Sequence, residues 1–254
     1  ELAGPLHPPV GSAHRHPGPL RRPALRAAAH PQRGLRAGRL ADGARQPRRP
    51  RRLAPARTFY HNETVYDAGT SGYAGPSFGY APVPDQYTLA EFSARELTAG
   101  ARVPVMAEID LVSSHTPWAP LPQVVAPAAL RDGSVFTAIH AAADTPEDVW
   151  RDPARVRAAY AASVVYTIDS LVSFVANAHD DNLVLIILGD HQPTTVVSGV
   201  GASHDVPVAV VAHDPAVLDR ISGWRWQDGM TPRPDAPVWP MEAFRDRFLT
   251  AYGG

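Results

Sequence analysis

Residues 183–193 constrain the fold more than any other stretch, because an apolar run there ends in a glycine, a carboxylate and an imidazole. The apolar residues 183–188 show no polar alternation, which is typical of a strand that is covered on both faces in a parallel sheet. In such sheets, functional side chains gather beyond the carboxyl ends of the strands. Asp190 and His191 are therefore predicted to lie at such an end, and carboxylate and imidazole groups are metal ligands.

The order of the other elements indicates an α/β fold with a layered, mostly parallel sheet and flanking helices. Strands are predicted at 103–112 and 206–212, and helices at 88–97, from 153 to a point between 177 and 181, and at 241–252. Thr88 and Glu91 have the spacing of a capping box, and Asp152 followed by Pro153 is a typical helix start. The long helix carries an apolar stripe with the spacing of a core-facing helix: Val156, Tyr160, Val164, Ile168, Leu171 and Val175.

The first 57 residues differ in composition from the rest. Residues 1–57 hold 13 arginines, ten prolines and two acids, with no aromatic residue and no isoleucine. Such a segment cannot bury enough apolar surface to offset the entropy of ordering, so it is predicted to be disordered. Its amino-acid composition is also typical of a sequence that is frame-shifted or non-native. A basic arm for nucleic acid is the alternative, but no aromatic side chain is present to stack on bases, and no such partner is expected. The folded region is predicted over 58–254.

The composition also restricts the chemistry of any site. The absence of cysteine excludes disulfides and thiolate ligands, so a metal ion must be held by His, Asp, Glu or hydroxyl oxygen. No stretch approaches the roughly 20 apolar residues that cross a bilayer, and the start of the chain lacks a signal pattern. The chain itself is therefore expected to carry neither a membrane anchor nor a targeting signal.

Two further histidines are predicted at strand ends. His115 follows the strand at 103–112, and His204 precedes the strand at 206–212. Simpler roles exist for each residue, since His115 can be a hydrogen-bonding loop residue, His204 a cap of its turn, and Asp190 a helix N-cap. Their joint placement favours a site in which imidazoles and carboxylates hold divalent cations that clamp a phosphoryl or sulfuryl group.

These motifs resemble the alkaline phosphatase and sulfatase superfamily, in its membrane-associated branch of sulfatase-like proteins, lipoteichoic acid synthases and phosphoethanolamine transferases. The resemblance covers about residues 60–252. Gly-Asp-His after a buried strand is similar to the motif that supplies two ligands of the catalytic zinc or manganese, which implies metal binding by Asp190 and His191. His115-Thr-Pro-Trp, and His204 before a Val-Pro strand, are similar to the histidines that bind the substrate phosphate or sulfate, or a second metal.

The nucleophile of this family has no counterpart in the chain. The family places a threonine, a serine or a formylglycine at a helix start near the beginning of the domain, close to a further acidic ligand. Thr58, Thr64 and Ser71 lie in stretches with the composition of loops, and none of them matches the nucleophile motif of the family. The resemblance therefore implies the C-terminal part of an alkaline-phosphatase-like domain, incomplete at its N-terminus and inactive as it stands.

The main hypothesis is a fragment of a metal-dependent hydrolase or transferase that acts on phosphate or sulfate esters through a covalent Thr or Ser intermediate. The implied metal is zinc or manganese, with magnesium and calcium as alternatives, and the implied partner is a small-molecule or lipid-linked ester. The resemblance also implies a membrane anchor outside this chain and an extracytoplasmic domain. The alternative hypothesis is a non-catalytic α/β module that keeps the fold for binding or structure. Phosphate and sulfate fit equally, and so do hydrolysis and transfer.

Overall fold

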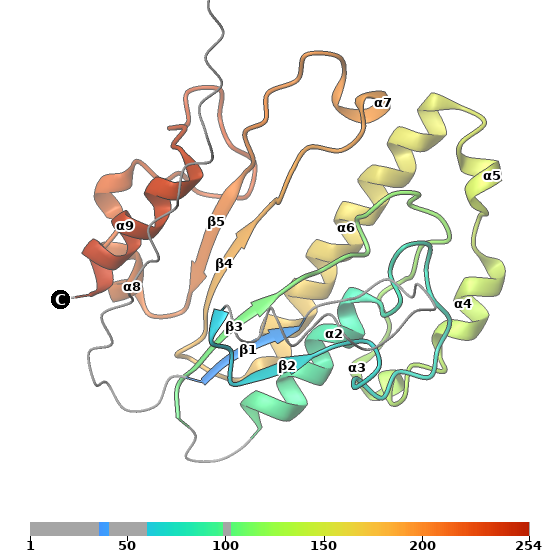
Figure 1. The fold of residues 1–254 in the computed structure, drawn as a ribbon, viewed down its shortest axis with the longest axis horizontal. Coiled ribbons are helices and arrows are strands. Elements are labelled where there is room, and N and C mark those ends of the chain that lie inside the picture. The colour runs from blue at the N-terminus through green and yellow to red at the C-terminus, as the bar shows by residue number, and fades with distance from the viewer. Residues whose placement is uncertain (1–35, 41–59, 99–102, 254) are drawn as a thin grey trace, which may run out of the picture. The chain divides into compact units, whose positions relative to one another are not determined.

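The computed structural model describes residues 36–40, 60–98 and 103–253 (Figure 1). The strands are β1 (Arg36–Leu40), β2 (Thr64–Tyr66), β3 (Val105–Ile109), β4 (Val184–Leu188) and β5 (Val208–Ala212). The α-helices are α2 (Asp85–Phe92), α3 (Pro127–Leu130), α4 (Phe136–Ala142), α5 (Pro146–Val149), α6 (Pro153–Ala178), α7 (Thr195–Ser198), α8 (Pro215–Asp219) and α9 (Met241–Tyr252). A π-helical segment (Ser93–Leu97) extends α2, and a 3-10 turn spans Ser222–Trp224.

The described strands form two separate sheets. β1 lies between β2 and β3, and both pairs are parallel, with Arg36 opposite Val105. β4 and β5 form an antiparallel pair, with Val184 opposite Ala212. The fold is therefore a mixture of helix and sheet, but these strands do not join into the single, mostly parallel sheet that the sequence predicts. The reason is that β3 and β4 do not pair with each other and instead border a common cavity.

β1 lies inside the segment 1–57, whose composition predicts disorder. Residues 36–40 nevertheless pair with a strand on each side, and the disorder of the segment as a whole stays a prediction. Composition does not predict this strand because the hydrogen bonds between strands are made by backbone N–H and C=O groups. Every residue except proline carries both groups. The rest of the segment lies outside the described residues.

Helices α2 and α6 support β3 and β4 together. Leu89 and Phe92 of α2 are buried in one cluster with Leu171 and Phe174 of α6. Alternate side chains of the two strands pack against this cluster, as expected for strands with one face toward a helical layer: Val105, Ala107, Ile109, Leu185 and Ile187. Strands of both sheets therefore share a single helical support.

The long helix α6 begins where the sequence predicts. The Asp152 carboxylate accepts a hydrogen bond from the Ala154 N–H at 2.8 Å, and Pro153 occupies the first turn. Within the predicted apolar stripe, Leu171 is buried, whereas Val175 is 39% exposed. The stripe therefore identifies the core-facing side but extends one turn too far.

Replacing the Asp152 cap by alanine is expected to lower the free energy of unfolding by about 1 kcal/mol, because the Ala154 N–H loses its acceptor. Urea denaturation followed by circular dichroism measures this change. Asp169→Ala is the matched control, since Asp169 is an exposed acid in the middle of the same helix. An equal loss in both variants would show that the cap contributes nothing specific.

Helix α6 is also long and apolar enough to cross a membrane, judged by length and composition alone. This corrects the expectation that no stretch of the chain reaches that length, because alanine and valine residues outside the stripe extend the apolar run. Leu171 and Phe174 pack into the core, while Val165 and Val172 are 57% and 62% exposed. The helix meets the criteria for a membrane span and at the same time forms part of the core.

Helix α2 begins at Asp85, three residues before the predicted start at Thr88. Thr88 lies inside the helix, where its N–H donates to the Pro84 carbonyl at 3.0 Å, so the predicted capping box is wrong. Pro84 precedes the first turn with φ −64°. The π-helical segment continues the element to Leu97, which is the predicted end.

Aromatic clusters organise the remaining parts of the structure. Phe136 of α4 is fully buried against Phe78 and other side chains of the loop before α2. Near the C-terminus, the Trp224 ring meets Trp239 and Phe244 edge to face, with centroids 5.3 and 6.1 Å apart. Trp224 therefore packs on Phe244 of α9, and α9 has the predicted bounds.

Candidate functional site

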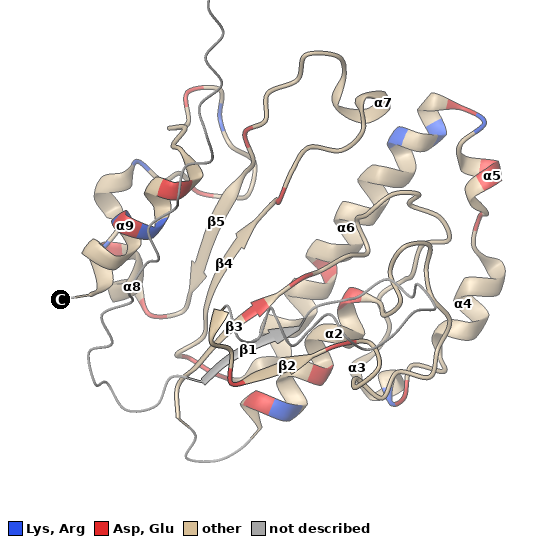
Figure 2. Ribbon diagram, viewed as in Figure 1, with Lys and Arg blue, Asp and Glu red and all other residues tan. Residues whose placement is uncertain are grey.

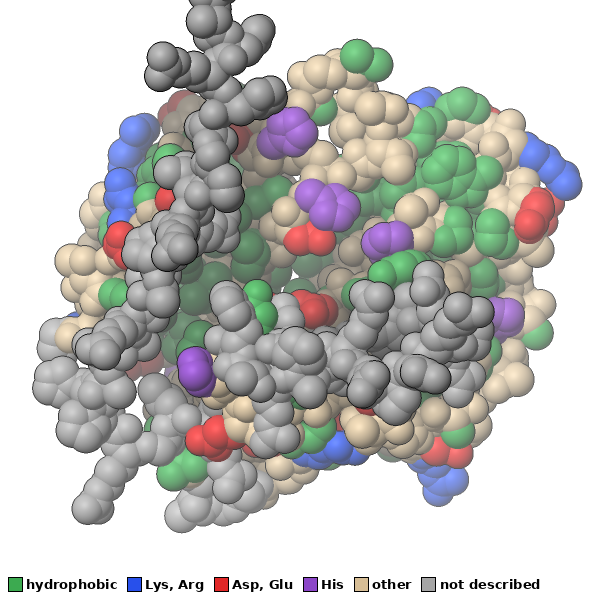
Figure 3. Space-filling model, viewed as in Figure 1, with side chains coloured by type: hydrophobic (Ala, Val, Ile, Leu, Met, Phe, Trp, Pro, Cys, Tyr) green, Lys and Arg blue, Asp and Glu red, His purple; other side chains and the backbone are tan. Residues whose placement is uncertain are grey.

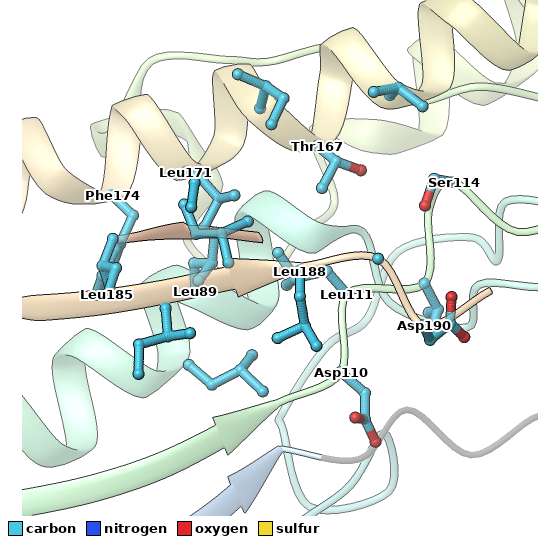
Figure 4. Close-up of a pocket in the computed structure, with 18 of the residues that line it drawn as sticks. Leu89, Asp110, Leu111, Ser114, Thr167, Leu171, Phe174, Leu185, Leu188 and Asp190 are labelled. Carbon is cyan, nitrogen blue, oxygen red and sulfur yellow. The ribbon is translucent and has the colours of Figure 1, made fainter. Parts of the chain in front are cut away.

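A cavity of about 2080 Å³, here called the β3–β4 cleft, lies between these two strands. Figure 4 shows its apolar end, where side chains converge from two helices and from β4: Leu89, Leu171, Phe174 and Leu185. The same view shows Asp110, Ser114 and Asp190 at the opposite, polar end. In Figure 3, histidine and acidic side chains border a hollow on this face in which apolar side chains are visible. The cleft therefore joins an apolar trough to a polar mouth.

Three of the four predicted site residues line the cleft. His115 reaches it from the loop after β3, and Asp190 and His191 reach it from the loop after β4. β4 and β5 themselves carry no charged side chain (Figure 2). Asp190 is therefore the first charged group after an entirely apolar strand, as the sequence indicates.

Asp190 and His191 interact with each other and remain open to solvent. Oδ1 of Asp190 accepts a hydrogen bond from the His191 N–H at 2.8 Å, and Oδ2 lies 3.4 Å from His191 Nε2. The side chains of Asp190 and His191 are 87% and 70% exposed. The apolar strand fixes the backbone, while both ligand groups stay accessible.

The imidazoles of His115 and His191 have their Nδ1 atoms next to a carbonyl oxygen. His191 Nδ1 lies 2.9 Å from the Gln192 oxygen, and His115 Nδ1 lies 2.7 Å from the Thr116 oxygen. A carbonyl oxygen only accepts, so the tautomer with its proton on Nδ1 satisfies each contact. In that tautomer Nε2 keeps the lone pair that a metal-binding histidine uses, and in His191 this atom also lies 3.4 Å from Asp190 Oδ2.

Aromatic side chains hold the loop that carries His115. The Tyr80 ring stacks on the imidazole with the ring centroids 3.8 Å apart. Trp118 is buried, donates from Nε1 to the Ser114 carbonyl at 2.7 Å, and stacks on Trp150. His115 itself is exposed. The loop is therefore fixed by its neighbours while the imidazole is free to meet a ligand.

His204 is exposed in the loop before β5 and does not line the cleft. Its loop is nevertheless tied to the loop after β4, because the Gln192 side-chain amide donates to the Asp205 carbonyl. The Asp205 N–H in turn donates to Ser203 Oγ at 3.0 Å. The structure thus connects the two loops but leaves the His204 imidazole outside the cleft.

Within the described part of the chain, no group of three or more histidine and acidic side chains could hold a metal ion. The four predicted residues therefore do not make a complete metal centre in this arrangement. Asp190 and His191 are one oxygen ligand and one nitrogen ligand in direct contact, whereas zinc sites usually have four ligands or three with an open position. Further ligands have to come from groups beyond this pair.

Sequence reasoning missed Asp85, which anchors the loop before His115. Asp85 is 1% exposed, and its carboxylate accepts hydrogen bonds from the Ser113 N–H, the Ser113 hydroxyl and the Thr167 hydroxyl, at 2.9, 2.8 and 2.6 Å. Burial raises the pKa of Asp85 above its usual value, and the hydrogen bonds from Thr167 and Ser113 partly offset this. The Pro84–Asp85 pair is a local signal in the sequence. Local spacing does not reveal hydrogen-bond partners that are as distant in sequence as Ser113 and Thr167.

No family model matches the chain, and no curated protein matches it either. Among solved structures, the chain is similar to the lipoteichoic acid synthase LtaP from Listeria monocytogenes, with 16% sequence identity and a TM-score of 0.46. The match covers 70% of this chain and 43% of that one, so this chain spans less than half of the LtaP chain.

Proposed function

We propose that the chain is part of a metal-dependent hydrolase or transferase that acts on phosphate or sulfate esters. The observation that carries the proposal is the exposed Asp190–His191 pair at the carboxyl end of β4, on the same cleft as His115. The resemblance of Gly-Asp-His and His-Thr-Pro-Trp to sulfatase-like motifs supports it. The alternative, a non-catalytic binding module, is favoured by the lack of a three-residue metal cluster among the described side chains.

The donor atoms of the pair fit a divalent cation. A carboxylate oxygen and an imidazole nitrogen suit zinc or manganese, whereas magnesium and calcium prefer oxygen ligands alone. Asp190 Oδ2 and His191 Nε2 are the atoms that would hold the ion. When bound, such a cation lowers the pKa of a hydroxyl nucleophile and neutralises charge on the transferred group.

The other two histidines are assigned to the substrate. His115, whose ring stacks on Tyr80, is assigned to hold a non-bridging oxygen of the ester when both ring nitrogens carry protons, or a second metal through Nε2 when the ring is neutral. His204, on the loop tied to Gln192, is assigned the same kind of role. The nucleophile, a threonine or serine, is expected from a segment outside this chain.

The proposed substrate is a small-molecule or lipid-linked phosphate or sulfate ester. In keeping with the sulfatase-like resemblance, the natural protein is proposed to be membrane-anchored through a segment outside this chain, with this domain outside the cytoplasm. These assignments rest on the motifs.

Metal removal tests the proposed function in the natural protein that contains this chain. Hydrolysis of p-nitrophenyl phosphate and p-nitrophenyl sulfate is expected to stop after chelation and to return with Mn²⁺ or Zn²⁺, because the leaving and attacking oxygens need charge neutralisation. The absorbance of released p-nitrophenol measures the rate. Hydrolysis that persists in chelator would contradict a metal-dependent reaction, and no hydrolysis under any condition would favour the binding module.

A further inference from the structure

A tight turn at residues 78–81 lies before helix α2. The Phe78 N–H donates to the Ala81 carbonyl at 2.8 Å, and the Ala81 N–H donates to the Phe78 carbonyl at 2.9 Å. Gly79 and Tyr80 are therefore the two central residues of a hydrogen-bonded hairpin turn. Gly79 has φ +56°, a backbone conformation that glycine adopts without a steric cost. Two hydrogen bonds fix this 78–81 turn, and Tyr80 lies at its tip.

The 78–81 turn connects the core to the β3–β4 cleft. Phe78 and Ala81 are both buried, and the Phe78 ring meets the fully buried Phe136 of α4 edge to face, with the ring centroids 6.0 Å apart. Tyr80, in contrast, is 42% exposed and lines the cleft. A side chain at the tip of this turn is therefore held at the cleft by contacts that are made in the core.

The turn packs on the loop after β3 at two points. At Gly79 a Cβ atom would lie only 3.1 Å from Pro117 Cδ and 3.3 Å from the Ala119 carbonyl oxygen, so the turn backbone rests directly on this loop. Next to it, the Tyr80 ring stacks on the His115 imidazole, with the centroids 3.8 Å apart and the planes 24° from parallel. This separation is that of carbon atoms in van der Waals contact. The turn thus contacts both the backbone of the loop and its functional side chain.

The stack restrains the imidazole in a way that its own hydrogen bond does not. Within the described part of the chain, the His115 ring has one hydrogen-bond contact, from Nδ1 to the Thr116 carbonyl oxygen at 2.7 Å. Thr116 is the next residue, so this contact moves together with the loop. Tyr80 belongs to a separate segment that is anchored in the core. Because an exposed side chain without such a neighbour exchanges among staggered rotamers, the stack is what ties the ring to the rest of the fold.

We infer that Tyr80 is a positioning residue, whose ring holds the His115 imidazole in the orientation that an ester oxygen or a second metal in the cleft requires. Holding a group in its productive geometry removes the entropy cost of orienting it when the ligand arrives. The ring makes the stack and the hydroxyl takes no part in it, so phenylalanine is expected to replace tyrosine and leucine is not. The role of Tyr80 rests on the proposed function, whereas the restraint of the imidazole does not.

Nuclear magnetic resonance of the 254-residue chain tests the restraint. With isotope-labelled histidine, the signal that disappears in His115→Gln identifies the His115 ring, and an aromatic face stacked on that ring shifts its signal upfield. Tyr80→Leu is expected to move the signal downfield, toward that of an unstacked histidine, whereas Tyr80→Phe should leave it in place. Trp226→Leu is the matched control, since Trp226 is another exposed aromatic residue and does not line the cleft. Gly79→Ala pushes the turn off the loop and should move the signal as Tyr80→Leu does.

Kinetics of the natural protein test the role. Tyr80→Leu is expected to lower kcat for p-nitrophenyl phosphate by about three- to tenfold, which is the range that the loss of one aromatic pair allows, and Tyr80→Phe should restore most of it. The decisive measurement is the double variant. In a His115→Ala background, Tyr80→Leu should have no further effect, because a residue that acts only through His115 has nothing left to position. A residue that merely stabilised the fold would lower the rate in both backgrounds.

A His115 signal that stays in place in Tyr80→Leu would overturn the inference, and so would an equal loss of kcat in both backgrounds. Circular dichroism identifies any variant that does not fold, and Gly79→Ala then takes the place of Tyr80→Leu. An unmodified natural protein without any hydrolysis would count against the proposed function. The histidine signal alone would then decide whether Tyr80 restrains the ring.

Discussion

The His191→Ala variant of the natural protein is expected to lose metal-dependent ester hydrolysis by about 100-fold or more, because the change removes a direct metal ligand. Mutation of a residue that only hydrogen-bonds a metal ligand already lowers metal affinity or activity by about 10–100-fold. The remaining Asp190 carboxylate is a single oxygen ligand on an exposed loop. Initial rates with p-nitrophenyl phosphate, measured across a titration of Mn²⁺ or Zn²⁺, give both the rate and the apparent metal affinity. We expect the metal concentration for half-maximal rate to rise strongly.

His213→Ala is the matched control for this experiment. His213 is also exposed, with 76% of its side chain accessible, and also lies near a carboxylate, since Nδ1 is 4.0 Å from Asp181. It follows β5 and does not line the cleft. The control should keep the rate and the metal requirement of the unmodified protein. A harmless His191→Ala change in an active protein would remove the basis of the proposed metal site.

The secondary structure around the site could be predicted because its signals are local. The apolar run before Gly189 predicts β4, and the strand predicted at 103–112 contains β3, so the positions of His115, Asp190 and His191 after strand ends were accessible from the sequence. Asp152 with Pro153 fixed the start of α6 for the same reason. Each of these signals lies within a few residues of the feature it predicts.

The arrangement of the strands could not be predicted in the same way. The split between β3 and β4 depends on what pairs with each edge, and periodicity within one strand does not contain that information. β1 was missed because its five residues lie in an arginine-rich segment, where composition argues against a strand. The hydroxyl partners of Asp85 are equally distant, since Ser113 and Thr167 lie 28 and 82 residues further along the chain.

The Asp85→Ala variant is expected to lower the free energy of unfolding by about 2–4 kcal/mol, because three buried donors lose their acceptor. The Asp85 carboxylate connects α2, the loop after β3 and α6 through Ser113 and Thr167. Ser113 is two residues before His115, so the loss should also loosen the loop at the cleft. Asp85→Asn is the conservative control. Its side-chain amide oxygen can accept a hydrogen bond from the Ser113 N–H, and its amide N–H can donate to a hydroxyl oxygen of Ser113 or Thr167. Urea denaturation should show a much smaller loss for this variant.

The two Asp85 variants also differ from the unmodified chain in their pH dependence. Burial raises the pKa of Asp85 in the folded state, and hydrogen bonds from Thr167 and Ser113 offset only part of this rise. Between its usual pKa and this raised pKa, the folded chain binds more protons than the unfolded chain, so stability falls as the pH rises through that window. The contribution is complete below the usual pKa and lost above the raised one. An asparagine side chain does not titrate, so the Asp85→Asn profile, measured by urea denaturation from acidic to neutral pH, should be flatter across the window. If the pH profiles of stability run parallel for Asp85→Asn and the unmodified chain, the pKa of Asp85 is not raised. If Asp85→Ala is as stable as Asp85→Asn, the buried hydrogen bonds do not hold the loop.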